Sequence, residues 1–180
     1  MKKILFIIDA QNDFCHENGS LNCQDSSIAV KNIIELLRRT QFDMIVNTAD
    51  THEEDYYLES IEGKHLPIKH CIKNTWGHKI HKGIYDTLYE QTCDWYTIDK
   101  ETFMVNPENI AKVLENEYKC EIYVCGFATD ICVMNNALLI KGMFPDRFEI
   151  NVIENCCAGT SAENHNKAIE LMKVNHINIL

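Results

Sequence analysis

The sequence predicts an α/β fold, a doubly wound parallel six-stranded sheet in the order 3-2-1-4-5-6 with helices on both faces. Short, nearly continuous apolar runs alternate with segments whose apolar residues recur at helical spacing. Strands that are apolar throughout indicate a parallel sheet covered on both faces, and right-handed crossovers make such a sheet doubly wound. The 180 residues contain no linker, internal repeat or low-complexity tract, so we expect a single domain over residues 1–180.

Six runs carry the strand pattern. We expect the first run to be a buried strand rather than a signal peptide, because Asp9 ends the short apolar stretch and no small-residue cleavage site follows. The predicted strands are Lys3–Ile8, Asp43–Thr48, Trp95–Ile98, Glu121–Cys125, Phe148–Ile153 and Ile177–Leu180.

Four segments between these strands carry helix signals. Ser26 or Ser27 is a plausible cap for the first, Pro107 suits the first turn of the second, and Thr160–Glu163 has the form of a capping box. The predicted helices run from the serine cap through Leu37, from Pro107 through Glu117, from Ile131 to Lys141 and from Thr160 through Met172.

The composition is that of an ordinary globular protein, with 46% hydrophobic and 24% charged residues. The formal net charge of -10 argues against nucleic acid or an anionic membrane as the main partner. No apolar run approaches the roughly 20 residues that span a bilayer. Nine cysteines at irregular spacing form no zinc-ribbon pattern, and we expect reduced thiols in a cytoplasmic protein.

The connection between Asp50 and Asp94 is long and polar for a compact domain. Connections of this kind are usually functional. The alternative is a surface excursion with a short helix around His78–Tyr89, in which His78 and His81 are surface residues. The histidines of this connection are His52, His65, His70, His78 and His81.

Polar residues follow four of the predicted strands. Asp9 follows the first, Asp50 the second, Lys100 the third, and the segment 126–132 the fourth. Ligands of open parallel sheets bind beyond the carboxyl ends of the strands, where the strand order reverses. In the order 3-2-1-4-5-6 the first and fourth strands flank that point, so Asp9 and Cys132 are expected to share one crevice.

These residue types suit nucleophilic catalysis. Cys132 opens a predicted helix, whose N-terminal amides and a nearby lysine are expected to lower the thiol pKa. Asp9 can accept the thiol proton and return it to a leaving amine, and the turn at Ala128 with the amide of Cys132 can form an oxyanion hole. Each residue alone also has a plain structural explanation, as a buried cysteine, a turn aspartate or a surface lysine. Their joint placement favours chemistry.

The motifs around these residues resemble those of the isochorismatase-like cysteine hydrolases, and within them the nicotinamidase and pyrazinamidase branch. Asp9–Phe14 resembles the first-strand motif with the catalytic aspartate, Gly126–Val133 the nucleophile motif, and Lys100 falls where the family keeps its catalytic lysine. The resemblance covers nearly the whole chain. It implies attack of the thiolate on an amide carbonyl, a thioester that water hydrolyses, and a cis peptide bond at Phe127–Ala128.

The same resemblance implies a divalent metal ion beside the thiol. Asp50-Thr51-His52 resembles the D-x-H metal motif, and the segment 67–71 resembles the one that supplies a further histidine, here His70. Two histidines and a carboxylate suit zinc first, with iron or manganese as alternatives.

The match to this branch has departures. Tyr56 and Leu58 stand where many relatives place another histidine. Glu62 is the first candidate for the missing ligand and Glu59 the second. Phe14 is available to pack against a substrate ring. The structural alternative is that Asp50 caps a turn and that the eight histidines of the chain are spaced by coincidence.

We therefore expect a cysteine-dependent amidohydrolase that converts nicotinamide to nicotinate and ammonia. Hydrolysis of another small amide or ureido compound by the same three residues is the first alternative. A non-enzymatic small-molecule-binding module is the alternative from another class. The expected partner is a small-molecule amide, with no nucleic acid and no membrane. Members of the family are often homo-oligomers, although nothing in this chain marks an interface.

Overall fold

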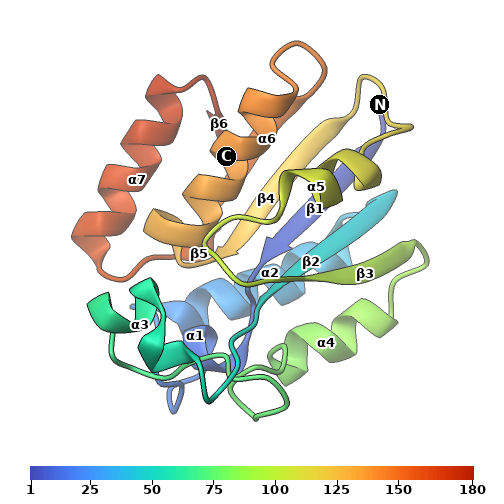
Figure 1. The fold of residues 1–180 in the computed structure, drawn as a ribbon. Coiled ribbons are helices and arrows are strands. Elements are labelled where there is room, and N and C mark those ends of the chain that lie inside the picture. The colour runs from blue at the N-terminus through green and yellow to red at the C-terminus, as the bar shows by residue number, and fades with distance from the viewer.

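The computed structural model describes residues 1–180 and contains one six-stranded sheet in the order β3-β2-β1-β4-β5-β6 (Figure 1). Every neighbouring pair of strands is parallel. The predicted fold class and strand order are therefore confirmed. The strands are β1 (Lys3–Ile8), β2 (Met44–Asp50), β3 (Asp94–Lys100), β4 (Glu121–Phe127), β5 (Glu149–Ala158) and β6 (Asn178–Ile179).

Helices cover both faces of the sheet. Figure 1 shows α2 and α4 on one face, and α5, α6 and α7 on the other. The short helix α3 lies beyond the carboxyl ends of the strands. The helices are α1 (Asn12–Cys15), α2 (Ser26–Arg39), α3 (Ile61–His65), α4 (Lys82–Tyr89), α5 (Pro107–Val113), α6 (Met134–Met143) and α7 (Ala162–Val174), with a 3-10 turn at Tyr57–Glu59 and a π-helical turn at Thr129–Val133.

Several strands extend further toward their carboxyl ends than the apolar runs predict. Asp50 and Lys100 are register partners at the last pair of β2 and β3, and Phe127 pairs with Ala158 at the end of β4 and β5. Hydrogen bonding between buried neighbours continues the strands past the point at which the sequence becomes polar. Asp50 and Lys100 thus belong to the sheet itself.

Two predicted helix caps are wrong. Asp25, with a left-handed backbone at φ 60°, precedes α2, and no side chain caps that helix. At α7 the cap is Ser161, whose hydroxyl accepts the amide of Asn164 at 3.1 Å. The hydroxyl of Thr160 instead donates to the carboxylate of Asp130, so this side chain does not cap the helix. The helix that begins at Pro107 also ends earlier than predicted, at Val113.

A single cluster of 41 buried residues forms the core between the sheet and its helices. All of β1 from Ile4 to Ile8 is fully buried, as expected for a central strand flanked by β2 and β4. No helix in the structure combines the length and the apolar character that crossing a membrane requires.

Gly126 allows β4 to approach β1 at the end that carries the polar residues. Its backbone has φ +126°, and a Cβ atom there would lie 2.0 Å from the carbonyl oxygen of Ile8. Only glycine adopts this conformation at low cost and leaves room for the neighbouring backbone. The close approach brings the segment that follows β4 next to Asp9, the residue that follows β1.

Replacing Gly126 with alanine should therefore separate these two strands. We expect Gly126→Ala to lower the free energy of unfolding by about 3–5 kcal/mol, because backbone strain and a steric clash add together. Gly142→Ala is the matched control, since Gly142 lies in α6 with no atom within 4 Å of the added Cβ. It should raise stability by about 0.5–1 kcal/mol. Urea denaturation of both variants measures the difference, and equal stabilities would contradict the strain argument.

Candidate active site and metal centre

Asp9, Lys100 and Cys132 meet in one buried crevice beyond the carboxyl ends of β1, β3 and β4. The ammonium group of Lys100 lies 2.7 Å from Oδ2 of Asp9 and 3.5 Å from Sγ of Cys132. All three residues are buried, with at most 5% of their surface exposed. Asp9 has a left-handed backbone with φ 47°, which turns its carboxylate into the crevice, and the hydroxyl of Thr48 donates to Oδ1.

The charges in this crevice are strongly coupled. Burial raises the pKa of Asp9, although the charge of Lys100 opposes the shift. Burial acting alone would lower the pKa of Lys100, but Asp9, Cys132 and Asp50 together raise it well above its ordinary value. The ammonium group is therefore held in its charged form by its anionic neighbours.

The expected lowering of the thiol pKa is wrong for the resting site. Burial raises the pKa of Cys132 well above its ordinary value, and the negative charge of Asp9 raises it further. Lys100 lowers it, but by less. In the resting site the thiol therefore keeps its proton, beside a carboxylate that can accept it.

Cys132 lies in a π-helical turn, Thr129–Val133, that precedes α6. The predicted helix from Ile131 therefore begins as a wider turn, in which the amide of Val133 donates to the carbonyl oxygen of Ala128 at 3.1 Å. The peptide bond at Phe127–Ala128 is cis, as the family resemblance implies. Ala128 is buried beside the turn at 6% exposure, and its amide and that of Cys132 are the candidate oxyanion donors.

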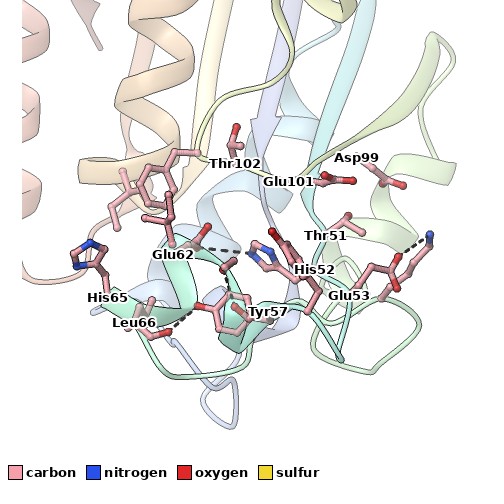
Figure 2. Close-up of a pocket in the computed structure, with 16 residues that line it drawn as sticks. Thr51, His52, Glu53, Tyr57, Glu62, His65, Leu66, Asp99, Glu101 and Thr102 are labelled. Carbon is pink, nitrogen blue, oxygen red and sulfur yellow. Dashed lines mark hydrogen bonds and ion pairs between the residues drawn. The ribbon is translucent and has the colours of Figure 1, made fainter.

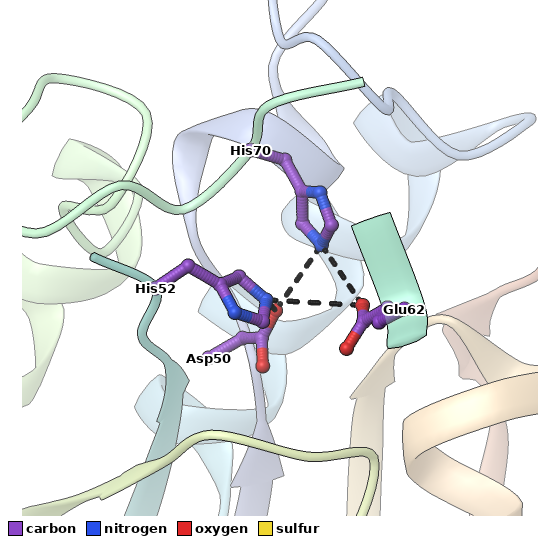
Figure 3. A group of neighbouring side chains, drawn as sticks. All are labelled: Asp50, His52, Glu62 and His70. Carbon is purple, nitrogen blue, oxygen red and sulfur yellow. Dashed lines mark hydrogen bonds and ion pairs between the residues drawn. The ribbon is translucent and has the colours of Figure 1, made fainter. Parts of the chain in front are cut away.

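Asp50, His52, Glu62 and His70 form one group of potential metal ligands (Figure 3). Oδ2 of Asp50 lies 2.9 Å from Nε2 of His52 and 3.3 Å from Nε2 of His70. Oε1 of Glu62 lies 3.8 and 3.6 Å from the same two nitrogens. An ion about 2.1 Å from each donor would place the donors roughly 3–3.5 Å apart, so the group fits a divalent cation.

The protonation of this group also suits a metal ion. Nδ1 of His70 donates to the carbonyl oxygen of Ile68 at 2.9 Å, which leaves Nε2 with a free lone pair directed at the group. Burial acting alone would raise the pKa of Asp50, but hydrogen bonds from His52 and His70 and the charge of Lys100 hold it below its ordinary value. Burial and the charge of Asp50 raise the pKa of Glu62. Without a cation the two carboxylates repel each other.

Two supporting residues escaped the sequence analysis. Tyr57 is 1% exposed, and its ring packs edge-on against His52 and His70 at centroid distances of 4.8 and 5.1 Å. Oδ2 of Asp13 accepts the amide of Cys71 at 2.7 Å and so holds the segment that carries His70. The only signal for Tyr57 was its place in the long connection. Asp13 lay within the recognised first-strand motif.

The remaining candidates occupy different positions. Phe14 packs edge-on against His70 at 5.6 Å and is 8% exposed. Glu59 is exposed and lies outside the ligand group. His78 and His81 are partly exposed and lie outside the ligand group. His78 bonds to the hydroxyl of Thr51 at 2.9 Å, and His81 caps α4.

A cavity of about 830 Å³ opens over the ligand group (Figure 2). His52 and Glu62 reach it, and so do Asp99 and Glu101 on either side of Lys100, and Ile131 next to Cys132. The other apolar side chains in its wall are Tyr56, Tyr57, Ile61, Leu66 and Phe103, and the remaining lining residues are polar or charged. The cavity thus gives solvent access to two of the potential metal ligands, and its wall includes sequence neighbours of Lys100 and Cys132.

Comparison with known proteins assigns the family. The model of the isochorismatase domain matches residues 3–179, and the chain belongs to this family. In sequence it is 28% identical over 178 residues to the uncharacterized isochorismatase family protein PncA of Bacillus subtilis, covering 92% of this chain and 91% of that protein. It is 26% identical over 186 residues to the nicotinamidase/pyrazinamidase of Mycobacterium tuberculosis, covering 99% and 98%.

Solved structures share the fold. The pyrazinamidase of Pyrococcus horikoshii in complex with zinc superposes with a TM-score of 0.75 at 25% identity, covering 100% of this chain and 99% of that chain. PnC1 from L. infantum in complex with nicotinate superposes with a TM-score of 0.82 at 21% identity, covering 99% and 92%.

The geometry predicts which glutamate serves the metal ion. Glu62→Gln should weaken zinc binding by about tenfold or more, because it removes a charged ligand. Glu59→Gln is the matched control and should leave the affinity unchanged, because Glu59 lies outside the group. Competition against a chromophoric chelator measures both dissociation constants. Weaker binding in Glu59→Gln alone would reverse the assignment.

Proposed function

We propose that the protein is a nicotinamidase, which hydrolyses nicotinamide to nicotinate and ammonia. The contact of Lys100 with both Asp9 and Cys132 carries the proposal, since it joins a nucleophile, a proton acceptor and a fixed cation in one buried site. Nicotinamidase relatives support the substrate, among them the enzyme of Saccharomyces cerevisiae at 25% identity over 173 residues. We place the protein in the cytoplasm, where its nine free thiols remain reduced.

In the proposed first half-reaction, Asp9 takes the proton of the Cys132 thiol as the sulfur attacks the amide carbonyl carbon. The carbonyl oxygen becomes negative and is held by the amides of Ala128 and Cys132. Asp9 then gives its proton to the amide nitrogen. The carbon–nitrogen bond breaks, ammonia leaves, and a thioester joins the acyl group to Cys132.

In the second half-reaction, Asp9 takes a proton from a water molecule that attacks the thioester carbon. The carbon–sulfur bond breaks, Asp9 returns the proton to sulfur, and the carboxylic acid product loses its remaining proton to solvent and leaves as the anion. Lys100 remains charged throughout and stabilises the negative charge that moves between Asp9 and Cys132. The raised pKa of the thiol matches this scheme, because the thiolate forms only as the attack proceeds.

Asp50, His52, Glu62 and His70 would hold the metal ion, which we propose to be zinc. When bound, the ion would supply a Lewis acid with an open coordination position, which the pyridine nitrogen of the substrate could fill. Phe14, packed against His70, would then lie beside the substrate ring. A pure binding module has no need for a buried lysine between a carboxylate and a thiol, so the contacts of Lys100 disfavour that alternative.

A second candidate reaction is hydrolysis of a larger amide by the same residues. The cavity of about 830 Å³ favours it, because pockets of this size accommodate ligands larger than a single six-membered ring. The two candidates share the catalytic groups and differ only in the part of the substrate that fills the entrance.

Ammonia release from nicotinamide tests the proposal. The metal-replete protein should release ammonia, and both chelation and Cys132→Ala should lower the rate by about 10³-fold or more, because each removes an essential group. Cys93→Ala is the matched control, since this partly exposed thiol lies outside the site, and it should retain full activity. Restoring zinc should recover the chelated enzyme and leave Cys132→Ala inactive.

Two other outcomes would change the assignment. Metal-replete protein that releases no ammonia from nicotinamide but hydrolyses a larger amide would support the second candidate. Activity that survives in Cys132→Ala would exclude the cysteine mechanism for both.

A further inference from the structure

The nucleophile turn is tied to the start of α7 by two side chains. Oγ1 of Thr129 lies 2.8 Å from Nδ1 of His165. One residue further on, the carboxylate of Asp130 accepts the amide and the hydroxyl of Thr160 at 2.8 and 2.6 Å. Thr129 directly follows Ala128, so both contacts hold the stretch between the two candidate oxyanion donors.

The bond between Thr129 and His165 is the more enclosed of the two. Thr129 is fully buried, and its hydroxyl has no other hydrogen-bond partner in the structure. His165 stands in the first turn of α7, where its amide donates to Ser161. Nε2 of His165 lies 3.8 Å from Oε1 of Glu154, which favours the tautomer with its proton on Nε2. Nδ1 is then an acceptor, and the Thr129 hydroxyl donates to it.

We infer that His165 is a positioning residue, which orients the nucleophile turn so that the amides of Ala128 and Cys132 point at the oxyanion. The inference rests on the proposed function. A threonine hydroxyl that is buried and singly bonded adopts the direction that its acceptor sets. Without its acceptor, the buried Thr129 hydroxyl is unpaired, and the turn that carries it is no longer held in one orientation. Small displacements of oxyanion donors matter most once the carbonyl oxygen has become negative.

The proposed role predicts a loss of kcat with little change in KM. His165→Ala should lower kcat for nicotinamide about tenfold, less than the loss of a whole oxyanion donor, and should leave KM within about twofold. Thr129→Val removes the hydroxyl from the other side and should have the same effect. Combining the two should cost no more than either alone, because both remove one interaction.

A conservative variant separates hydrogen bonding from packing. His165→Asn places an amide atom as many bonds from Cα as Nδ1, so it should restore most of kcat. Ser161→Ala is the matched control for the stability of α7, because the Ser161 hydroxyl caps this helix and bonds only to the amide of Asn164. It should lower the melting temperature while leaving kcat unchanged.

Nicotinaldehyde gives a second readout. Its carbonyl carbon would bond to the sulfur of Cys132, the thiol proton would pass to Asp9, and the carbonyl oxygen would carry the negative charge in the oxyanion site. His165→Ala should therefore weaken its affinity by about the same factor as kcat falls. The affinity for nicotinate, which forms no such adduct, should stay unchanged.

The outcomes distinguish the two proposals. A wild-type protein without nicotinamide turnover would overturn the proposed function, and the inference with it. A wild-type protein that turns over, beside a His165→Ala variant with unchanged kcat, would overturn the inference alone. So would additive losses in the double variant, or a loss in Ser161→Ala that matches that of His165→Ala.

Discussion

The ammonium group of Lys100 is the interaction on which the rest of the site depends. It is buried at 4% exposure and contacts Asp9 at 2.7 Å, Asp50 at 3.0 Å and Cys132 at 3.5 Å. Removing an ammonium group from water is costly, and the cost is offset only when anionic partners surround the charge. Burying two carboxylates in one crevice is also costly, because their negative charges repel each other unless a cation lies between them. Each group is therefore stable in place because the others are present.

This constraint explains why the fold matters to the chemistry. The three partners come from the ends of β1, β2 and the turn after β4, and Lys100 itself ends β3. The strand order puts β1 between β2 and β4, so their polar ends converge on one crevice. Gly126 lets β4 close on β1 at the same end. A sheet with another order would scatter the same residues, and the lysine would have no set of partners to offset its burial.

Much of this arrangement could be predicted from the chain. Continuous apolar runs defined the strands, and the position of Asp9 and Lys100 at their ends followed from the pattern. The turn around Cys132 could not be predicted in detail, because π-helical geometry depends on contacts with α7 that are remote in sequence. The raised thiol pKa was missed for a related reason. A helix start and a lysine both lower it, but burial and Asp9 outweigh them, and burial is set by the whole fold.

The group of potential metal ligands could also be predicted only in part from the sequence. The D-x-H motif was visible in the sequence, and the family resemblance named Glu62 as the first candidate for the remaining ligand and Glu59 as the second. The choice was decided by α3, which turns Glu62 toward His52 and His70. Tyr57 was not predicted, because an aromatic residue in a polar connection is expected to be exposed. In the structure its ring packs edge-on against both histidines.

Asp50 links the two halves of the site. One carboxylate oxygen accepts from Lys100 at 3.0 Å and the other lies 2.9 Å from His52. A cation at the ligand group would draw charge from the same carboxylate that helps to hold Lys100, so its occupancy changes the field at Asp9 and Cys132. In the proposed reaction, substrate orientation and thiol activation therefore depend on one charge network.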